Sequence, residues 1–308
     1  MSNQLTNYSP QFMGWDIDVV RQQIDDLMTP AVVSPSPLKA FSSYFAQLPI
    51  PSGVINVPIQ TWPSTANSNA GGVTINAATA SSAQLTLNKD YGNFYAFNPA
   101  EVQQYGLGYA INSWIRPAIY GNDRYLVSAS LAVAVNGSNY ASASAKFGNS
   151  GSFTPAGAAK LNSEMSKQGI NGQRFALLVP DYYWNIQSSV AVLGNQQGAE
   201  ALLNRINGAY KMNILEGADL PDITGVDTTL TSSLVGIAGN GAGIAVGTAL
   251  PQVKHPAGEM FAYTSPWTGV TYLVESYYNE YLRTNMIGAS FIYDVQKVQN
   301  TIRRLYSL

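Results

Sequence analysis

Apolar residues recur at helical spacing near the start of the chain. Residues 16–28 carry apolar side chains that would line one face of a helix: Ile17, Val20, Ile24 and Leu27. The stretch that follows, PAVVSPSPLKAF, contains three prolines, which favour extended chain. A short helix followed by an extended proline-rich segment cannot bury itself alone. We therefore predict that residues 1–50 form an arm rather than a domain.

Strand patterns follow in a stretch that has no charged residue between Lys39 and Lys89. Alternation and β-branched content predict strands in VINVPIQTW, VTIN, AQLTLN and NFYAF, and PSTANSNAGG has the composition of a loop. We interpret residues 51–97 as a long, neutral β-hairpin. It is either an ordinary surface hairpin or a flap that lies on another subunit, where an uncharged surface avoids a desolvation cost.

Helix signals mark the middle of the chain. Asn98, Pro99 and Glu101 stand where a cap, a first helical residue and an acidic third residue belong, so we predict a helix towards Arg116 that breaks or kinks at Pro117. The Ala- and Ser-rich stretch 125–135 suits a closely packed helix or strand. A second punctuated helix is predicted at 155–168, between a Thr154 cap and Gly169.

The stretch NGQRFALLVPDYYWNI, residues 171–186, reads as a turn, a buried strand at 174–179 and a helix capped by Asp181. A further helix is predicted at 198–206, and AYKMNILEG is predicted to be a strand. The chain then returns to strands on either side of Ser-Pro-Trp-Thr-Gly at 265–269 and ends in SFIYDVQKVQNTIRRLYSL. Helices and strands interleave with a long antiparallel element, which indicates an α+β fold rather than repeated βαβ units.

Composition narrows the class of protein. Only 11% of the 308 residues are charged, against about 25% in typical proteins, and the net charge is −2. Protein surfaces with few charges and little net charge tend to associate. The absence of cysteine excludes disulfides and thiolate metal sites. The first residues, MSNQLTNYSPQFMGW, have no secretory pattern, so we expect cytoplasmic synthesis, and the run 234–250 is too short and too polar for a membrane span.

Residues that could do chemistry are few. His255 is the only histidine, no nucleophile motif lies near it, and we interpret it as a loop residue. The glycine-rich stretch 236–247 matches neither phosphate-loop nor dinucleotide spacing, so we interpret it as close packing or a flexible loop. The carboxylates that could serve a hydrolase or bind a cation are Asp25, Asp26, Asp219, Asp222 and Asp227. We expect no catalytic residue, cofactor or metal. A hydrolase that uses these carboxylates stays an open alternative.

The order of these pieces resembles the major capsid proteins of tailed bacteriophages, with the Hong Kong ninety-seven type of fold. The clearest passage matches at Gly172, Arg174, Val179, Pro180, Asp181 and Tyr183. Looser echoes follow at Gly208, Ile214, Gly217, Leu220, Pro221, Thr268, Gly269, Tyr277, Tyr278, Phe291 and Tyr293. The resemblance rests on the order of these motifs along most of the chain.

The resemblance implies an α+β fold in four parts. They would be an N-terminal arm (1–50), an extended β-hairpin loop (51–97), a peripheral domain with a spine helix (98–170 and 270–308) and an axial domain (171–269). Arm and loop would add buried area in trans. Only about 50 residues precede the loop, so we expect no cleaved scaffolding segment. Lys89 stands at the base of the loop, so we do not expect the lysine–asparagine cross-links of some relatives.

The implied function is a structural subunit that assembles through pentamers and hexamers into an icosahedral virion shell around double-stranded DNA. Subunit contacts are expected at Trp62, Lys89, Tyr91, Arg174, Tyr183, Trp184 and Trp267. The basic residues Arg283, Lys297, Arg303 and Arg304 are expected to face DNA, although a pI near 5.4 argues against a dedicated DNA binder. Scaffold, portal and decoration proteins are further partners that the resemblance allows. A secreted or surface β-rich lattice protein or adhesin is the alternative.

Overall fold

The longest strand, β14 (Thr284–Lys297), organises a six-stranded sheet. The computed structural model describes residues 11–28, 36–46, 53–59, 81–137, 139–140, 145–147, 154–193, 212–217, 234–251 and 258–307. Along one edge β14 pairs first with β13 (Thr271–Asn279) and then with β11 (Ile244–Ala249), and along the other edge with β6 (Lys89–Phe97). β12 (Glu259–Thr264) and β3 (Ser42–Ala46) complete the sheet. Its 14 residues let β14 serve three partners at once.

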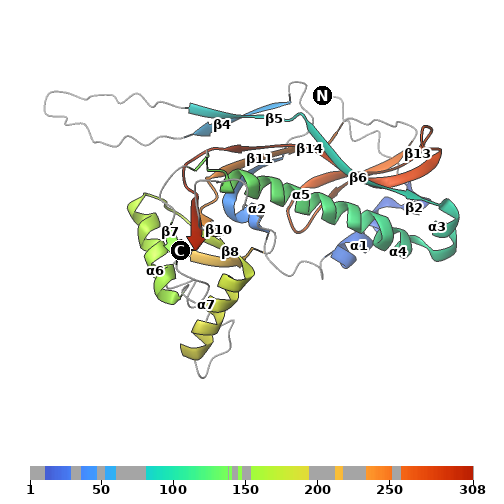
Figure 1. Cartoon of the computed structure of the whole chain (residues 1–308). Coiled ribbons are helices and arrows are strands. Elements are labelled where there is room, and N and C mark those ends of the chain that lie inside the picture. The colour runs from blue at the N-terminus through green and yellow to red at the C-terminus, as the bar shows by residue number, and fades with distance from the viewer. Residues whose placement is uncertain are drawn as a thin grey trace.

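A long helical segment covers one face of this sheet (Figure 1). It consists of α3 (Pro99–Tyr105), α4 (Leu107–Ala110), a π-helical turn (Ile111–Ile115) and α5 (Arg116–Val135). Asn98 caps α3 as predicted, accepting the backbone N–H of Ala100 at 3.1 Å. The predicted break at Pro117 is wrong. The chain breaks at Gly106, where φ is +81°, and Pro117 lies in the first turn of α5, next to the π turn that accommodates its missing N–H.

The N-terminal helix α1 (Ile17–Met28) has the predicted apolar face. Ile17, Val20 and Ile24 are buried, and Met28 rather than Leu27 is the fourth buried residue. This face packs into the main core of its own chain, so the expectation that the arm is buried in trans is wrong for α1. The short strands β1 (Gln11–Phe12) and β2 (Trp15–Asp16) precede it, and α2 (Pro37–Phe41) leads into β3.

A hairpin of β4 (Val54–Ile59) and β5 (Ser81–Thr86) projects from the sheet (Figure 1). Its stem is antiparallel, as the alternation predicted. At its base Ile55, Leu85 and Leu87 pack on β11, where Gly247 leaves room for all three. The expected tip, with VTIN and Trp62, lies outside the described residues. β6 falls in the range expected for the loop, yet it pairs along its whole length with β14.

A second sheet has five strands and packs around a core of its own. It has the order β7 (Ala145–Phe147), β15 (Arg303–Ser307), β10 (Leu234–Gly239), β8 (Arg174–Leu178) and β9 (Met212–Glu216). Helices α6 (Pro155–Lys167) and α7 (Pro180–Leu193) flank it. Asp181 is not the cap of α7 but lies in its first turn, because the Val179 carbonyl already accepts the N–H groups of Tyr182 and Tyr183. The predicted helix at 198–206 lies outside the described residues.

The glycine-rich stretch joins the two sheets. It forms β10, a turn at residues 240–243 and β11, and of its two predicted alternatives close packing is confirmed. A Cβ at Gly236 would lie 2.4 Å from the Leu177 carbonyl oxygen, and one at Gly239 would lie 2.7 Å from that of Thr301. Glycine is therefore what lets β10 lie this close to β8 and to the segment before β15.

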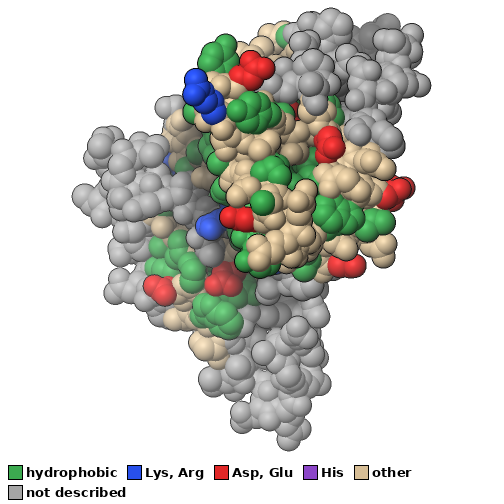
Figure 2. Space-filling model, turned by 90° about the vertical axis from the view of Figure 1, so that its right-hand side faces the viewer, with side chains coloured by type: hydrophobic (Ala, Val, Ile, Leu, Met, Phe, Trp, Pro, Cys, Tyr) green, Lys and Arg blue, Asp and Glu red, His purple; other side chains and the backbone are tan. Residues whose placement is uncertain are grey.

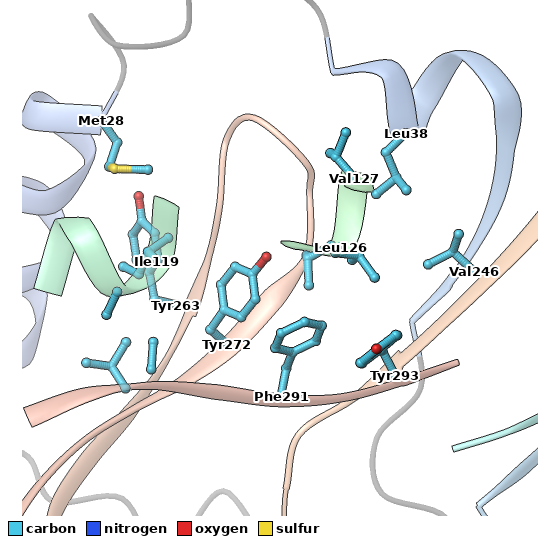
Figure 3. Packing of buried hydrophobic residues seen from close by; sticks show 14 of the residues in the cluster. Met28, Leu38, Ile119, Leu126, Val127, Val246, Tyr263, Tyr272, Phe291 and Tyr293 are labelled. Atoms are coloured by element: carbon cyan, nitrogen blue, oxygen red, sulfur yellow. The ribbon is translucent and has the colours of Figure 1, made fainter. Parts of the chain in front are cut away.

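The main core lies between α5, α1 and the six-stranded sheet. Figure 3 shows Tyr272, Phe291 and Tyr293 pointing from the sheet towards Leu126 and Val127 of α5. The ring of Tyr272 meets that of Phe291 edge-on, with centroids 5.1 Å apart. Each large apolar side chain buried here contributes roughly 1.5–3 kcal/mol, so this layer fixes the helix on the sheet.

Candidate functional site

Asp123 is a carboxylate inside the core, carried by α5 and with no exposed surface. It accepts hydrogen bonds from the hydroxyls of Ser265 at 2.6 Å, Thr268 at 2.5 Å and Tyr272 at 2.6 Å. Burial raises the pKa of Asp123, and the three hydroxyl donors and the charge of Lys39 offset part of that rise. All three donors belong to the β12–β13 turn or the start of β13, so the carboxylate clamps this turn onto the helix.

The clamped turn presents Trp267, one of the predicted contact residues. Trp267 is partly buried and stacks on Tyr120 of α5, with ring centroids 5.9 Å apart. Gly269 closes the turn in a left-handed conformation, with φ at +77°, and donates its N–H to the Ser265 carbonyl. The clamp therefore fixes the stacked rings of Trp267 and Tyr120 beside the helix. The sequence predicted Trp267 as a contact residue, but it did not predict the clamp or the partner ring.

Lys89 holds the base of the hairpin. Its ammonium lies 2.8 Å from the carboxylate of Asp294 on β14, which also accepts the backbone N–H of Thr86 at 2.9 Å and the Gln296 amide at 3.2 Å. Burial alone would raise the pKa of Asp294, but these hydrogen bonds and the Lys89 charge outweigh it, and the pKa is lowered. The stem of the hairpin is thus tied by an ion pair as well as by packing.

Replacing Asp294 with asparagine is expected to lower the free energy of unfolding by about 1–2 kcal/mol at neutral pH, since half-exposed Lys89 limits the effect through solvent screening. The folded pKa is depressed, so the stabilisation is present above the unfolded pKa and is lost as pH falls through the folded value. Urea denaturation at neutral and acidic pH measures this. Asp26→Asn, at an exposed position of α1, is the control. A stability gap that does not narrow towards acidic pH would contradict the ion pair's role.

Two further predicted contact residues make their contacts within the chain. Tyr91 stacks flat on Tyr125, with ring centroids 3.7 Å apart. Arg174 is buried and donates to the carbonyl of Ile170 at 2.8 Å, the carbonyl of Asn162 at 3.0 Å and the hydroxyl of Ser166 at 2.8 Å. Arg174 therefore ties the C-terminal half of α6 to the start of β8.

The aromatic pair on α7 divides between core and surface. Tyr183 is partly buried against the second core, while the side chain of Trp184 is 57% exposed and its indole N–H donates to Glu216 at 3.3 Å. Trp184 thus offers a large apolar surface close to β9.

The four basic residues are not brought together. Arg303 and Arg304 are neighbours on β15, but Arg304 is buried, with its guanidinium 5.5 Å from the centre of the Tyr306 ring, while Arg303 donates to Gln168. Lys297 donates to the Asn139 carbonyl. Arg283 lies exposed in the β13–β14 turn at the far end of the other sheet. The basic cluster of the sequence is therefore dispersed over two sheets.

Exposed aromatic residues gather at the end of the molecule that carries α3, α4 and the β13–β14 turn. The large hydrophobic side chains exposed there are Tyr95, Tyr105, Tyr109, Tyr278, Tyr281 and Leu282. Figure 2 looks onto this end and shows hydrophobic and uncharged atoms over most of it, with charged side chains scattered. The tyrosine-rich run YNEYL was the signal in the sequence, but its exposure followed only from the turn.

Other kinds of site have little support in the described part of the chain. The acidic residues of that part form no group that could hold a metal ion. His255, Asp219, Asp222 and Asp227 lie outside the described residues, as does Trp62. Asp25 accepts the hydroxyl of Tyr263 at 2.7 Å, which gives it a structural partner. No helix among the described residues has the length and apolar character required to cross a membrane.

Comparison with known proteins gives a result from structure only. No protein-family model matches the sequence, and no curated protein matches it. Among solved structures, the capsid of Ralstonia phage GP4 matches with a TM-score of 0.55 at 6% identity, covering 89% of this chain and 90% of that one.

Two further solved structures give the same result. The mature capsid of bacteriophage PhiM1 matches with a TM-score of 0.54 at 11% identity, covering 88% of this chain and 87% of the other. The capsid of cyanophage P-SCSP1u matches with a TM-score of 0.51 at 13% identity, covering 89% of each chain. The chain therefore has the α+β fold of these phage capsid proteins, with a long spine-like helix on a sheet.

Proposed function

We propose that the chain is a major capsid protein, a structural subunit that assembles through pentamers and hexamers into an icosahedral phage shell enclosing double-stranded DNA. The observation that carries the proposal is the fold, which agrees with phage capsids over nearly nine tenths of this chain and of theirs. A subunit of this kind needs no catalytic residue and no cofactor. Its place is the virion, after synthesis in the host cytoplasm.

The surface of the chain supports association with copies of itself. Only 11% of its residues are charged, so little desolvation penalty opposes burial of its surface. Aromatic side chains, which are enriched in protein interfaces, are exposed at one end of the molecule and at Trp184. These two surfaces lie on different elements, as a closed shell with several kinds of contact requires.

The hairpin supports an assembly in which one subunit reaches over another. Its stem projects beyond the six-stranded sheet and is held at the base by Lys89 and Asp294. In this proposal the part of the extended loop (51–97) that precedes β6 lies on the next subunit and brings Trp62 into contact with it. The axial part (171–269) meets its copies around the five- and six-fold axes through Tyr183 and Trp184. Lys89, Tyr91 and Arg174 act by shaping the parts that make these contacts.

Particle size tests the proposal directly. The purified protein, examined by light scattering and negative-stain electron microscopy, is expected to form hollow shells tens of nanometres across, or free pentamers and hexamers. A monodisperse 33.0 kDa monomer that stays monomeric at high concentration and with a scaffold partner present would rule out the capsid proposal.

A further inference from the structure

The outward side of α5 combines arginines with an aromatic residue. Arg116, Tyr120 and Arg124 follow one another at four-residue spacing and so lie along one side of the helix. Tyr120 is 43% exposed and Arg124 is exposed, whereas Asp123, the one carboxylate of this helix, is buried in the hydroxyl clamp. The outward side of α5 therefore carries positive charge and no negative charge of its own.

Neighbouring elements extend this surface. The Arg124 guanidinium lies 5.9 Å from the centre of the Tyr120 ring, and Tyr120 stacks on Trp267 of the clamped turn. Lys39 of α2 is exposed, and its Nζ lies 3.9 Å from the position a Cβ would take on Gly269 of the same turn. We call the surface made by Lys39, Arg116, Tyr120, Arg124 and Trp267 the α5 stripe.

The charge of the α5 stripe stands out from that of the chain, which carries a net charge of −2. Helix α1, which contacts α5, carries the exposed carboxylates Asp25 and Asp26, and Asp25 accepts the Tyr263 hydroxyl. Arg124, Tyr120, Trp267 and Lys39 are linked by these contacts, and Arg116, which is partly exposed, lies one helical turn before Tyr120. Of the basic residues that the sequence predicted to face DNA, Arg304 is buried, and Lys297 and Arg303 donate hydrogen bonds to groups of their own chain.

We propose that the α5 stripe binds the phosphate backbone of double-stranded DNA, without sequence preference, and that this side of α5 faces the interior of the shell. The proposal rests on the proposed capsid function. Lysine and arginine bind phosphates as cations and release condensed counterions, and arginine also donates in a planar fork. The rings act by holding the Arg124 side chain extended, which lowers the entropy lost on binding.

Salt-dependent DNA binding by soluble capsomers or dissociated subunits tests this surface, with a short random-sequence duplex as probe. The triple variant Lys39→Gln, Arg116→Gln, Arg124→Gln is expected to lower the slope of log K against log salt by about 2–3, since each phosphate contact contributes about 0.9. Affinity should fall about tenfold or more at moderate salt. The control is Lys160→Gln, Lys167→Gln, Arg283→Gln, which removes the same charge from α6 and the β13–β14 turn.

The outcomes separate this proposal from the capsid function. Shells from both triple variants, with DNA binding reduced only in the stripe variant, support both proposals. Shells with equal DNA binding in the two variants would overturn the stripe proposal and leave the capsid function standing.

Loss of shells with unchanged DNA binding would mean that the stripe contacts protein instead. The double variant Arg116→Gln, Arg124→Gln, checked by circular dichroism, replaces the triple variant if that fails to fold. An unaltered chain that forms neither shells nor pentamers and hexamers, even with a scaffold partner present, would refute the capsid function itself.

Discussion

Replacing Asp123 with alanine is expected to lower the free energy of unfolding by about 3–5 kcal/mol. The hydroxyls of Ser265, Thr268 and Tyr272 would then lose their common acceptor inside the core. The β12–β13 turn would also lose this side-chain tie to α5 and keep the stacking of Trp267 on Tyr120. Asp123→Asn should cost less, because its amide oxygen still accepts. Urea denaturation of each variant, in the same assembly state, measures the loss.

The pH dependence of Asp123 has the opposite sign to that of Asp294. Burial raises the pKa of Asp123, so its contribution to stability is fully present below the unfolded pKa and is lost as pH rises through the folded pKa. The stability of the unaltered chain relative to Asp123→Asn should therefore decline as pH rises through that window. Ser128→Ala, at an exposed position of the same helix, is the control and should change stability by about 0.5 kcal/mol or less. An Asp123→Ala variant as stable as this control would contradict the clamp.

Asp123 escaped prediction because of one wrong boundary. A helix that ended at Pro117 left residues 117–124 without an assigned element, so no face was counted there. Continued through the proline, the helical period places Asp123 beside Ile119 and Leu126, on the apolar side. A carboxylate at a core position is a strong signal, since buried charge requires partners. The missing fact was the π turn, which lets the helix accept Pro117.

Local patterns predicted the elements that carry their own punctuation. The cap at Asn98, the helix after Thr154, the strand at Arg174 and the turn at 265–269 all follow from nearest-neighbour chemistry. Partners across the chain were beyond such patterns. Lys89 and Asp294 are 205 residues apart, and β6 meets β14 only because the chain returns after passing through β7, β8, β9 and β10 of the second sheet. Sequence period describes a face, but it does not identify what covers that face.

The basic residues show that charges adjacent in the sequence need not share a surface, whereas charges spaced along a helix can. Adjacent residues of a strand point to opposite sides, so Arg303 and Arg304 could not have formed one patch once β15 was assigned. Residues four apart on a helix do share a side, and Arg116 and Arg124 flank Tyr120 in this way. Counting charge along elements rather than along the sequence would have exposed the α5 stripe.

Adding one methyl group at Gly288 is expected to destabilise the chain by about 3 kcal/mol or more. A Cβ there would lie 2.1 Å from the Asn93 carbonyl oxygen and 2.8 Å from the Phe94 Cα, and both are backbone atoms of β6. Backbone cannot rotate away as a side chain can, so β6 would have to separate from β14. Asn93 would move with it and lose its 2.7 Å hydrogen bond to Asn122 of α5. Urea denaturation of Gly288→Ala measures the loss.

The control is Gly108→Ala in α4, where no atom lies within 4 Å of the added Cβ. Alanine favours a helix over glycine, so this variant is expected to be neutral or more stable by up to about 1 kcal/mol. The same substitution should thus change the free energy of unfolding in opposite directions at the two sites. Space is free around Gly108, whereas backbone atoms of β6 fill the space beside Gly288. If both variants were equally stable, β6 would not be held against β14. The hairpin stem, which joins β6 at Lys89, would then lack the fixed base that its reach over a neighbouring subunit requires.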